Sequence, residues 1–154
     1  MPPPSGPLSV LRLRLRKLPH TYPVVVVGWP EDGPGGPDVA RIAAILLAGT
    51  PDNVLPARPV LDRVFAEHAP AIQRAFGQAT AAYLAGDARK ARGVLEGLAQ
   101  RLGDAVRNAL GVGVTPGNKP STIAAKGYDW ALRHPEGTDR LWRYLVAEVR
   151  DPSS

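Results

Sequence analysis

The chain has 154 residues, 44% of them apolar but only 6% aromatic, which fits one domain of Ala- and Leu-rich helices rather than an aromatic-rich β-sandwich. It contains no cysteine, three widely separated histidines and no apolar run near the roughly 20 residues that span a bilayer, which argues against a disulfide framework, a metal cluster and a membrane helix. The net charge is +5, and most of the excess basic residues lie in the first 20 positions. This charge is compatible with binding to DNA or another anionic partner but does not by itself predict it. We expect a soluble protein of a reducing cytoplasm, with no signal peptide, no cofactor and no membrane contact.

The N-terminal region divides into a Pro-rich tail and a basic stretch. Residues 1–7 are expected to form a flexible tail. Leucines alternate with arginines from Leu11 to Arg16, which is the strand period, yet four leucines also fit one helix face: Leu8, Leu11, Leu15 and Leu18. Leu and Arg are helix formers, so we favour a short basic helix over residues 8–18. Its candidates for contact with DNA in a channel or with another anionic partner are Arg12, Arg14, Arg16 and Lys17.

A strand, a loop and a helix are predicted next. The four consecutive valines of residues 22–29 indicate a strand buried on both faces. Residues 30–38 are rich in Pro and Gly and predict a loop, after which Asp38 is expected to cap a helix that Gly49 ends. Residues 50–59 contain three prolines and predict a rigid, extended loop.

Two long helical patterns form the middle of the chain. Pro70 interrupts the first pattern, so we expect a short helix to about Glu67 and a new helix from about Ala69. Asp87 is expected to cap the next helix, which Gly111 ends. Gly93 and Gly97 lie one turn apart inside that helix, and a close helix–helix approach would offset their cost in helix stability.

The C-terminal part is expected to deliver a final strand. After the loop of residues 111–120, Ser121 can cap a one- to two-turn helix that Gly127 ends. Residues 141–149 alternate in the strand period, and residues 151–154 predict a tail. The predicted fold is α+β: a single domain over residues 8–150, with a small, mostly antiparallel sheet on a helical hairpin and long Pro/Gly-rich loops. Two strands are marginal alone, so further strands are expected from the loops or from a neighbouring subunit.

The polar residues do not predict an enzyme. Capping explains Ser121, and a charged loop exposed to solvent explains Asp129, Glu136 and Asp139, which could act in hydrolysis only if the fold brought two of them together. The loop "GVTPGNKP" resembles a phosphate-binding loop, but Asn118 separates Gly117 from Lys119, and Pro120 stands where Ser or Thr is required. Stiff loops without a catalytic set favour protein–protein contact.

The first half of the chain resembles the phage tail-completion (neck, head–tail joining) proteins and the related virion morphogenesis proteins. In that family a Val-Gly strand precedes a "PDG"-type loop, a Val-Ala…Ala-Ala-Ile helix and a "GT…IPxRPF" segment. The counterparts here are Val27-Gly28, Pro37-Asp38, Val39-Ala40, Ala43-Ala44-Ile45, Gly49-Thr50 and Leu55-Pro56-Ala57-Arg58-Pro59-Val60.

The second half carries the remaining motifs of the same family, so the resemblance spans about residues 24–149. Relatives end with a "P-x-K-PSTI-x-x-KG" loop, an Asp-Thr-Gly turn and a final strand. This chain has Lys119-Pro120-Ser121-Thr122-Ile123, Lys126-Gly127 and the permuted turn Gly137-Thr138-Asp139. It departs from the family at Leu46-Leu47-Ala48-Gly49, where relatives often have "HEFG" or "QEFG", and at Val60 in place of Phe.

The resemblance implies a structural, non-enzymatic virion protein that forms a ring at the head–tail junction of a tailed phage or phage-like particle. The expected partners are copies of itself in a hexamer or dodecamer, the portal or head-closure proteins, and the tail tube or tail terminator proteins. Such a ring would be assembled in the bacterial host cytoplasm and would sit in the neck of the virion. The candidate residues for subunit or partner contact are Pro56, Arg58, Pro59, Lys119, Lys126 and Trp142.

The alternative hypothesis is a small basic nucleic-acid-binding module. It predicts that neutralising Arg12, Arg14 and Arg16 together weakens DNA binding and flattens its salt dependence, because each lost phosphate contact lowers the slope of log K against log salt by about 0.9. Fluorescence anisotropy with duplex DNA over a salt series measures both quantities. A triple variant with unchanged DNA affinity and slope would eliminate this alternative.

Overall fold

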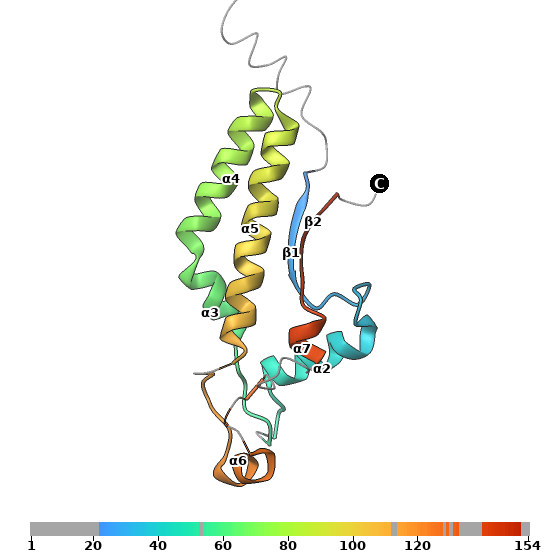
Figure 1. The fold of residues 1–154 in the computed structure, drawn as a ribbon, viewed down its shortest axis with the longest axis vertical. Coiled ribbons are helices and arrows are strands. Elements are labelled where there is room, and N and C mark those ends of the chain that lie inside the picture. Colours follow the sequence, from blue (N-terminus) through green and yellow to red (C-terminus); the bar gives the residue numbers. More distant parts are fainter. Residues whose placement is uncertain are drawn as a thin grey trace, which may run out of the picture.

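The computed structural model describes residues 22–52, 54–111, 114–127, 129, 131–132 and 140–151. Over these residues the fold is α+β, with mainly helices and one two-stranded antiparallel sheet (Figure 1). The basic stretch of residues 8–18 lies outside the described residues. The elements in chain order are β1 (Val24–Gly28), α2 (Gly36–Ala48), α3 (Val60–Glu67), α4 (Ala69–Leu84), α5 (Ala88–Ala109), α6 (Pro120–Lys126), α7 (Arg140–Arg143) and β2 (Val146–Arg150).

The sheet joins strands from the two ends of the described chain. β1 and β2 run antiparallel, with Val24 opposite Arg150 and Gly28 opposite Val146. Val25 and Val27 pack toward the α4–α5 hairpin, whereas Val24 is 51% exposed. The prediction of a strand buried on both faces is therefore wrong for the described part of the chain: four valines in a row suited such a strand, but the sheet covers helices with one face only.

The helical hairpin forms where the prolines and caps predicted it. α3 ends at Glu67 and α4 begins at Ala69 with Pro70 in its first turn, where a missing N–H costs little. Asp87 caps α5 by accepting a hydrogen bond from the Lys90 amide at 2.9 Å. These predictions are confirmed. α4 and α5 pack through small residues, among them Ala79, Ala82 and Ala91.

A glycine of α5 lies against the sheet. A Cβ built on Gly103 would lie only 2.5 Å from the Cβ of Ala147 in β2, so no larger residue fits there without moving the strand. Gly93 and Gly97 are instead exposed, and nothing lies within 4 Å of a Cβ built on either. The expectation of a close approach at these two glycines is wrong, because they lie on the solvent side of α5.

Arginines of α5 hold β2 on both sides of this contact. The Arg107 guanidinium donates to the Leu145 carbonyl at 3.3 Å, just before β2. Arg92 donates to the Val149 carbonyl at 3.3 Å and to both carboxylate oxygens of Asp151, the first residue of the expected tail. The carbonyls of Leu145 and Val149 thus accept hydrogen bonds from α5 on both sides of Ala147. These bonds fix the position of the strand along the axis of α5, in addition to the close contact at Gly103.

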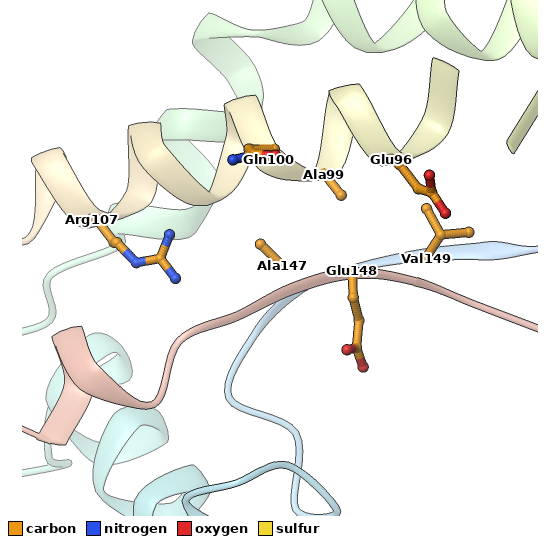
Figure 2. A pocket seen from close by; sticks show the side chains of 7 residues that line it. All are labelled: Glu96, Ala99, Gln100, Arg107, Ala147, Glu148 and Val149. Atoms are coloured by element: carbon orange, nitrogen blue, oxygen red, sulfur yellow. The ribbon is translucent and has the colours of Figure 1, made fainter. Parts of the chain in front are cut away.

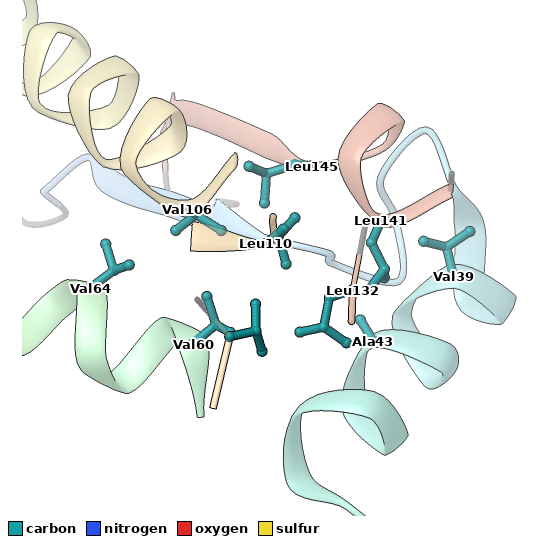
Figure 3. Packing of buried hydrophobic residues seen from close by; sticks show 10 residues of the cluster. Val39, Ala43, Val60, Val64, Val106, Leu110, Leu132, Leu141 and Leu145 are labelled. Atoms are coloured by element: carbon teal, nitrogen blue, oxygen red, sulfur yellow. The ribbon is translucent and has the colours of Figure 1, made fainter. Parts of the chain in front are cut away.

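A second core lies at the end of the hairpin near α2 and α7 (Figure 3). It joins α2, α3 and the last turn of α5 to Leu141 and Leu145. The indole of Trp29 donates to the Leu141 carbonyl at 2.8 Å, which connects the end of β1 to α7. The buried residues of this core are Val39, Ala43, Val60, Val64, Val106, Leu110, Val114, Leu132, Leu141 and Leu145.

The strand predicted over residues 141–149 is wrong in its first half. Residues 140–143 form α7, and the strand begins only at Val146. Leu141 and Leu145 are four residues apart and are both buried in the same core, which is helical spacing. Packing of these two leucines therefore overrides the local alternation that suggested a strand.

Two predicted caps are also wrong, although the helices they were meant to start are present. α2 begins at Gly36 after Gly35, so Asp38 lies inside its first turn. α6 begins at Pro120 after Lys119, and no side chain caps it, so Ser121 lies inside the helix. The predicted stops are confirmed: Gly49 follows α2 with φ 76°, and Gly127 follows α6 in the left-handed conformation. Within the described residues, no helix is long and apolar enough to cross a membrane.

Matched glycine substitutions in α5 test the contact with the sheet. Gly97→Ala should stabilise the protein by about 0.5–1 kcal/mol, because alanine favours the helix and meets nothing. Gly103→Ala should destabilise it by roughly 1–3 kcal/mol, because the added methyl overlaps Ala147. Urea unfolding followed by circular dichroism measures both changes. Equal effects of the two substitutions would contradict close packing at Gly103.

Candidate functional site

The loop after α2 is folded tightly back on that helix. The Arg58 amide donates to the Leu47 carbonyl at 2.8 Å, and the Thr50 amide donates to the Leu55 carbonyl at 2.9 Å. Gly49 makes this return path fit, because a Cβ there would lie 2.6 Å from the Ala57 nitrogen. The Gly49-Thr50 pair of the family motif thus has a local physical reason in this chain.

A short polar network fixes the tip of the same loop. The Thr50 hydroxyl donates to the Asp52 carboxylate and accepts from the Leu55 amide at 3.1 Å. The hydrogen bond from Thr50, together with one from the Val54 amide, lowers the pKa of Asp52 below its ordinary value. Val54 at this tip is 65% exposed, which places an apolar side chain on a structured protrusion.

Arg58 joins this loop to the loop that precedes α6. Its Nε donates to the Pro116 carbonyl at 2.9 Å, and its Nη2 lies 3.4 Å from the Gly117 carbonyl. The residue is only 6% exposed, and burial lowers the pKa of its guanidinium. A guanidinium stays charged in proteins, so these carbonyl contacts compensate part of the cost of its burial.

The two loops and α6 form one end of the molecule, far from the α4–α5 turn (Figure 1). We call residues 49–52, 54–59 and 114–127 the loop end. α6 has no buried residue, and Lys119 and Lys126 are exposed at its two ends. A helix without a fully buried residue leaves apolar and basic groups at the surface.

The predicted contact residues are distributed over this end and over α7. Pro59, Lys119 and Lys126 are exposed, and Pro56 is half-buried. Arg58 was expected at a subunit surface, but its guanidinium is buried and contacts carbonyls of its own chain. Trp142 was expected in a strand and lies half-buried in α7 instead. The basic candidates Arg12, Arg14, Arg16 and Lys17 lie outside the described residues.

A polar groove of about 420 Å³ lies between α5 and β2 (Figure 2). Its charged groups are already engaged: Glu96 accepts from Arg92 at 3.0 Å, and Arg107 contacts Asp104 and the Leu145 carbonyl. Figure 2 shows Glu148 directed away from α5. Two of these contacts lie within α5 and the third joins Arg107 to the Leu145 carbonyl, so they do not converge on one point in the groove. Its lining residues are Glu96, Ala99, Gln100, Arg107, Ala147, Glu148 and Val149.

The residues considered for hydrolysis are not brought together in the described part of the chain. Asp129 is exposed, whereas Glu136 and Asp139 lie outside the described residues. Among the residues that the structure describes, no group of three or more His, Asp or Glu side chains is arranged to hold a metal ion.

No protein-family model, curated protein or solved structure matches this chain.

Sequence reasoning missed what Arg58 and Gly103 do. Arg58 in the loop "PARP" was a candidate for subunit contact, whereas its side chain is buried within its own chain. The available signal was its position just before the first long helical pattern, where a loop must pass close to the core. Gly103 carried no such signal, since three glycines of α5 are equivalent in sequence.

Arg58 is expected to stabilise the loop end. Arg58→Ala should lower the free energy of unfolding by about 2–3 kcal/mol, because it removes the charge-assisted hydrogen bonds that join the two loops and the packing of a buried side chain. Arg74→Ala on the exposed face of α4 is the control and should stay within about 0.5 kcal/mol. Chemical denaturation gives the energies. Hydrogen exchange should show faster exchange over residues 114–119 in the Arg58 variant alone, and unchanged exchange there would contradict the bridging role.

Proposed function

We propose that this chain is a structural protein of a tailed phage or phage-like particle, which forms a ring at the head–tail junction and joins the portal complex to the tail. It acts by assembly and not by turnover of a substrate. The observation that carries the proposal is the convergence of its family-like motifs. Segments that are far apart in the sequence, Gly49-Thr50, Arg58-Pro59 and Lys119–Ile123, belong to one end of the molecule.

This convergence supports assembly because the motif residues have structural and not catalytic tasks. Gly49 permits the return of the loop, and Arg58 fixes it to the loop before α6. The loop end held in this way has exposed side chains, including those of Val54, Lys119 and Lys126. A stiff surface loses little conformational entropy when it binds, so its contacts favour association.

A ring requires two different surfaces on each copy, since a heterologous contact repeated around an axis closes on itself. We assign the loop end as one of these surfaces. The portal or head-closure proteins and the tail tube or tail terminator proteins are its partners along the ring axis. The small sheet and the α4–α5 hairpin form the core of each subunit. Basic side chains such as Arg12, Arg14 and Arg16 contact DNA in the channel without recognising its sequence. The place of function is the neck of the virion, after assembly in the bacterial host cytoplasm.

Charge reversal at the loop end tests the proposal. The double variant Lys119→Glu and Lys126→Glu should lose ring-sized oligomers, because like charges then face the neighbouring surface. Mass photometry and negative-stain electron microscopy of the wild-type and variant chains measure the population of rings.

The control carries the same change of charge at the opposite end of the molecule. Arg89 and Lys90 are exposed in the first turn of α5, where the helix dipole favours acidic residues. The double variant Arg89→Glu and Lys90→Glu should therefore leave the rings intact. A wild-type chain that stays monomeric at every concentration would overturn the ring itself. Rings that survive the loop-end reversal but not the control would move the contact to the α4–α5 turn.

A further inference from the structure

An apolar groove of about 490 Å³ runs between the edge of β1 and the helices α3, α4 and α5. Its floor is made by leucines of α5, and Phe76 on its α4 side is 43% exposed. It is far more apolar than the groove beside β2, which contains Glu96, Gln100 and Arg107. The lining residues are Val25, Val26, Val27, Phe65, Ile72, Phe76, Leu98 and Leu102.

The edge of β1 beside this groove has no partner strand among the described residues. β1 pairs with β2 on one side only, and the sheet has two strands. A strand edge next to apolar side chains is a template for another strand, since the edge supplies main-chain hydrogen bonds and the groove accepts every second side chain. The occupant should therefore be an extended segment with apolar residues at alternate positions.

The chain enters the described structure beside this groove. The ring of Tyr22 packs edge-on against that of Tyr83, with centroids 6.2 Å apart. Tyr83 lies in the last turn of α4, two helical turns beyond Phe76 on the same helix, and Pro23 is buried. Tyr22, the first described residue, thus lies beside the last turn of α4, two residues before β1, and 21 residues of sequence precede it.

We propose that residues 8–18 of the same chain form a third strand, antiparallel to β1, with Leu11, Leu13 and Leu15 in the apolar groove. The alternating segment from Leu11 to Leu15 has five residues, the length of β1. With the strand running over residues 8–18, residues 19–23 form a connection of five residues, which is within the usual length for a hairpin loop. This inference does not rest on the ring function, because it concerns one chain alone.

The apolar groove favours the strand period of residues 8–18 over the helix period. The helix formers Leu and Arg favour a helix in isolation, but a helix cannot hydrogen-bond a strand edge. In the extended form the leucines share one face, and Arg12, Arg14 and Arg16 share the other. The strand then covers α4 as β2 covers α5, and its arginines join the outer face of the sheet, where Val24 and Val26 lie.

Crosslinking between engineered cysteines tests the third strand in the full chain, which has no cysteine of its own. The double variant Leu13→Cys and Phe76→Cys, treated with a short bismaleimide, should give an intramolecular crosslink that migrates as a compact monomer. Two controls move one cysteine to the opposite face: Arg14→Cys with Phe76→Cys, and Leu13→Cys with Arg74→Cys on the exposed side of α4. Both should crosslink roughly tenfold less, because the reactive groups then lie on opposite faces.

Mixing the single variants Leu13→Cys and Phe76→Cys distinguishes one chain from two. The proposal predicts no crosslinked dimer in this mixture. A dimer band from the mixture would show that the segment binds a neighbouring copy and would overturn the intramolecular strand. Equal crosslinking of Leu13 and Arg14 variants, or none in either, would overturn the placement in the groove. The result is independent of ring formation, which is measured on the same samples by mass photometry.

Discussion

The close packing of β2 on α5 at Gly103 is the constraint on which the rest of the structure depends. Because Gly103 has no side chain, Ala147 can approach the helix closely. On both sides of Ala147, Arg92 and Arg107 donate hydrogen bonds to main-chain carbonyls of residues 149 and 145. β1 pairs with β2 and also packs directly on the hairpin, so its position depends in part on the same contact. Trp29 at the end of β1 then fixes α7 and closes the second core.

This frame separates two tasks within a small chain. The sheet covers one apolar face of the α4–α5 hairpin, and together they form a packed body. The loop end consists mainly of loops, which have few main-chain hydrogen bonds of helices or strands to hold them in place. Arg58 provides that support by joining the loop after α2 to the loop before α6. A buried guanidinium is a costly way to hold two loops, and a hydrophobic contact would serve stability as well. Its directional hydrogen bonds instead give the loop end one defined shape, which would suit the proposed assembly contact.

The sequence predicted what local chemistry determines and failed where packing decides. Pro70, Asp87, Gly49 and Gly127 act within one helical turn, so the helix boundaries they set are confirmed. The close contact at Gly103 depends on which face of α5 meets the sheet, and that face is chosen by residues more than forty positions away. Residues 140–143 form a helical turn instead of a strand for the same reason, with Leu141 buried in the second core.

The candidate site shows the same division between local and distant causes. The motif segments Gly49-Thr50, Arg58-Pro59 and Lys119–Ile123 all belong to the loop end, which the sequence did not predict. The burial of Arg58 could not be predicted, because its acceptors at Pro116 and Gly117 lie some sixty residues further along the chain. Sequence therefore identified the segments but not which side chains face outward.

Hydrogen exchange of the chain in dilute and in concentrated solution tests the central claim most directly, namely that the frame is internal and the loop end makes the assembly contact. Mass spectrometry of the two samples should show added protection at residues 54–59 and 115–127 on concentration, with α5 and β2 equally protected in both. Added protection confined to the α4–α5 turn, or no change with concentration, would contradict it.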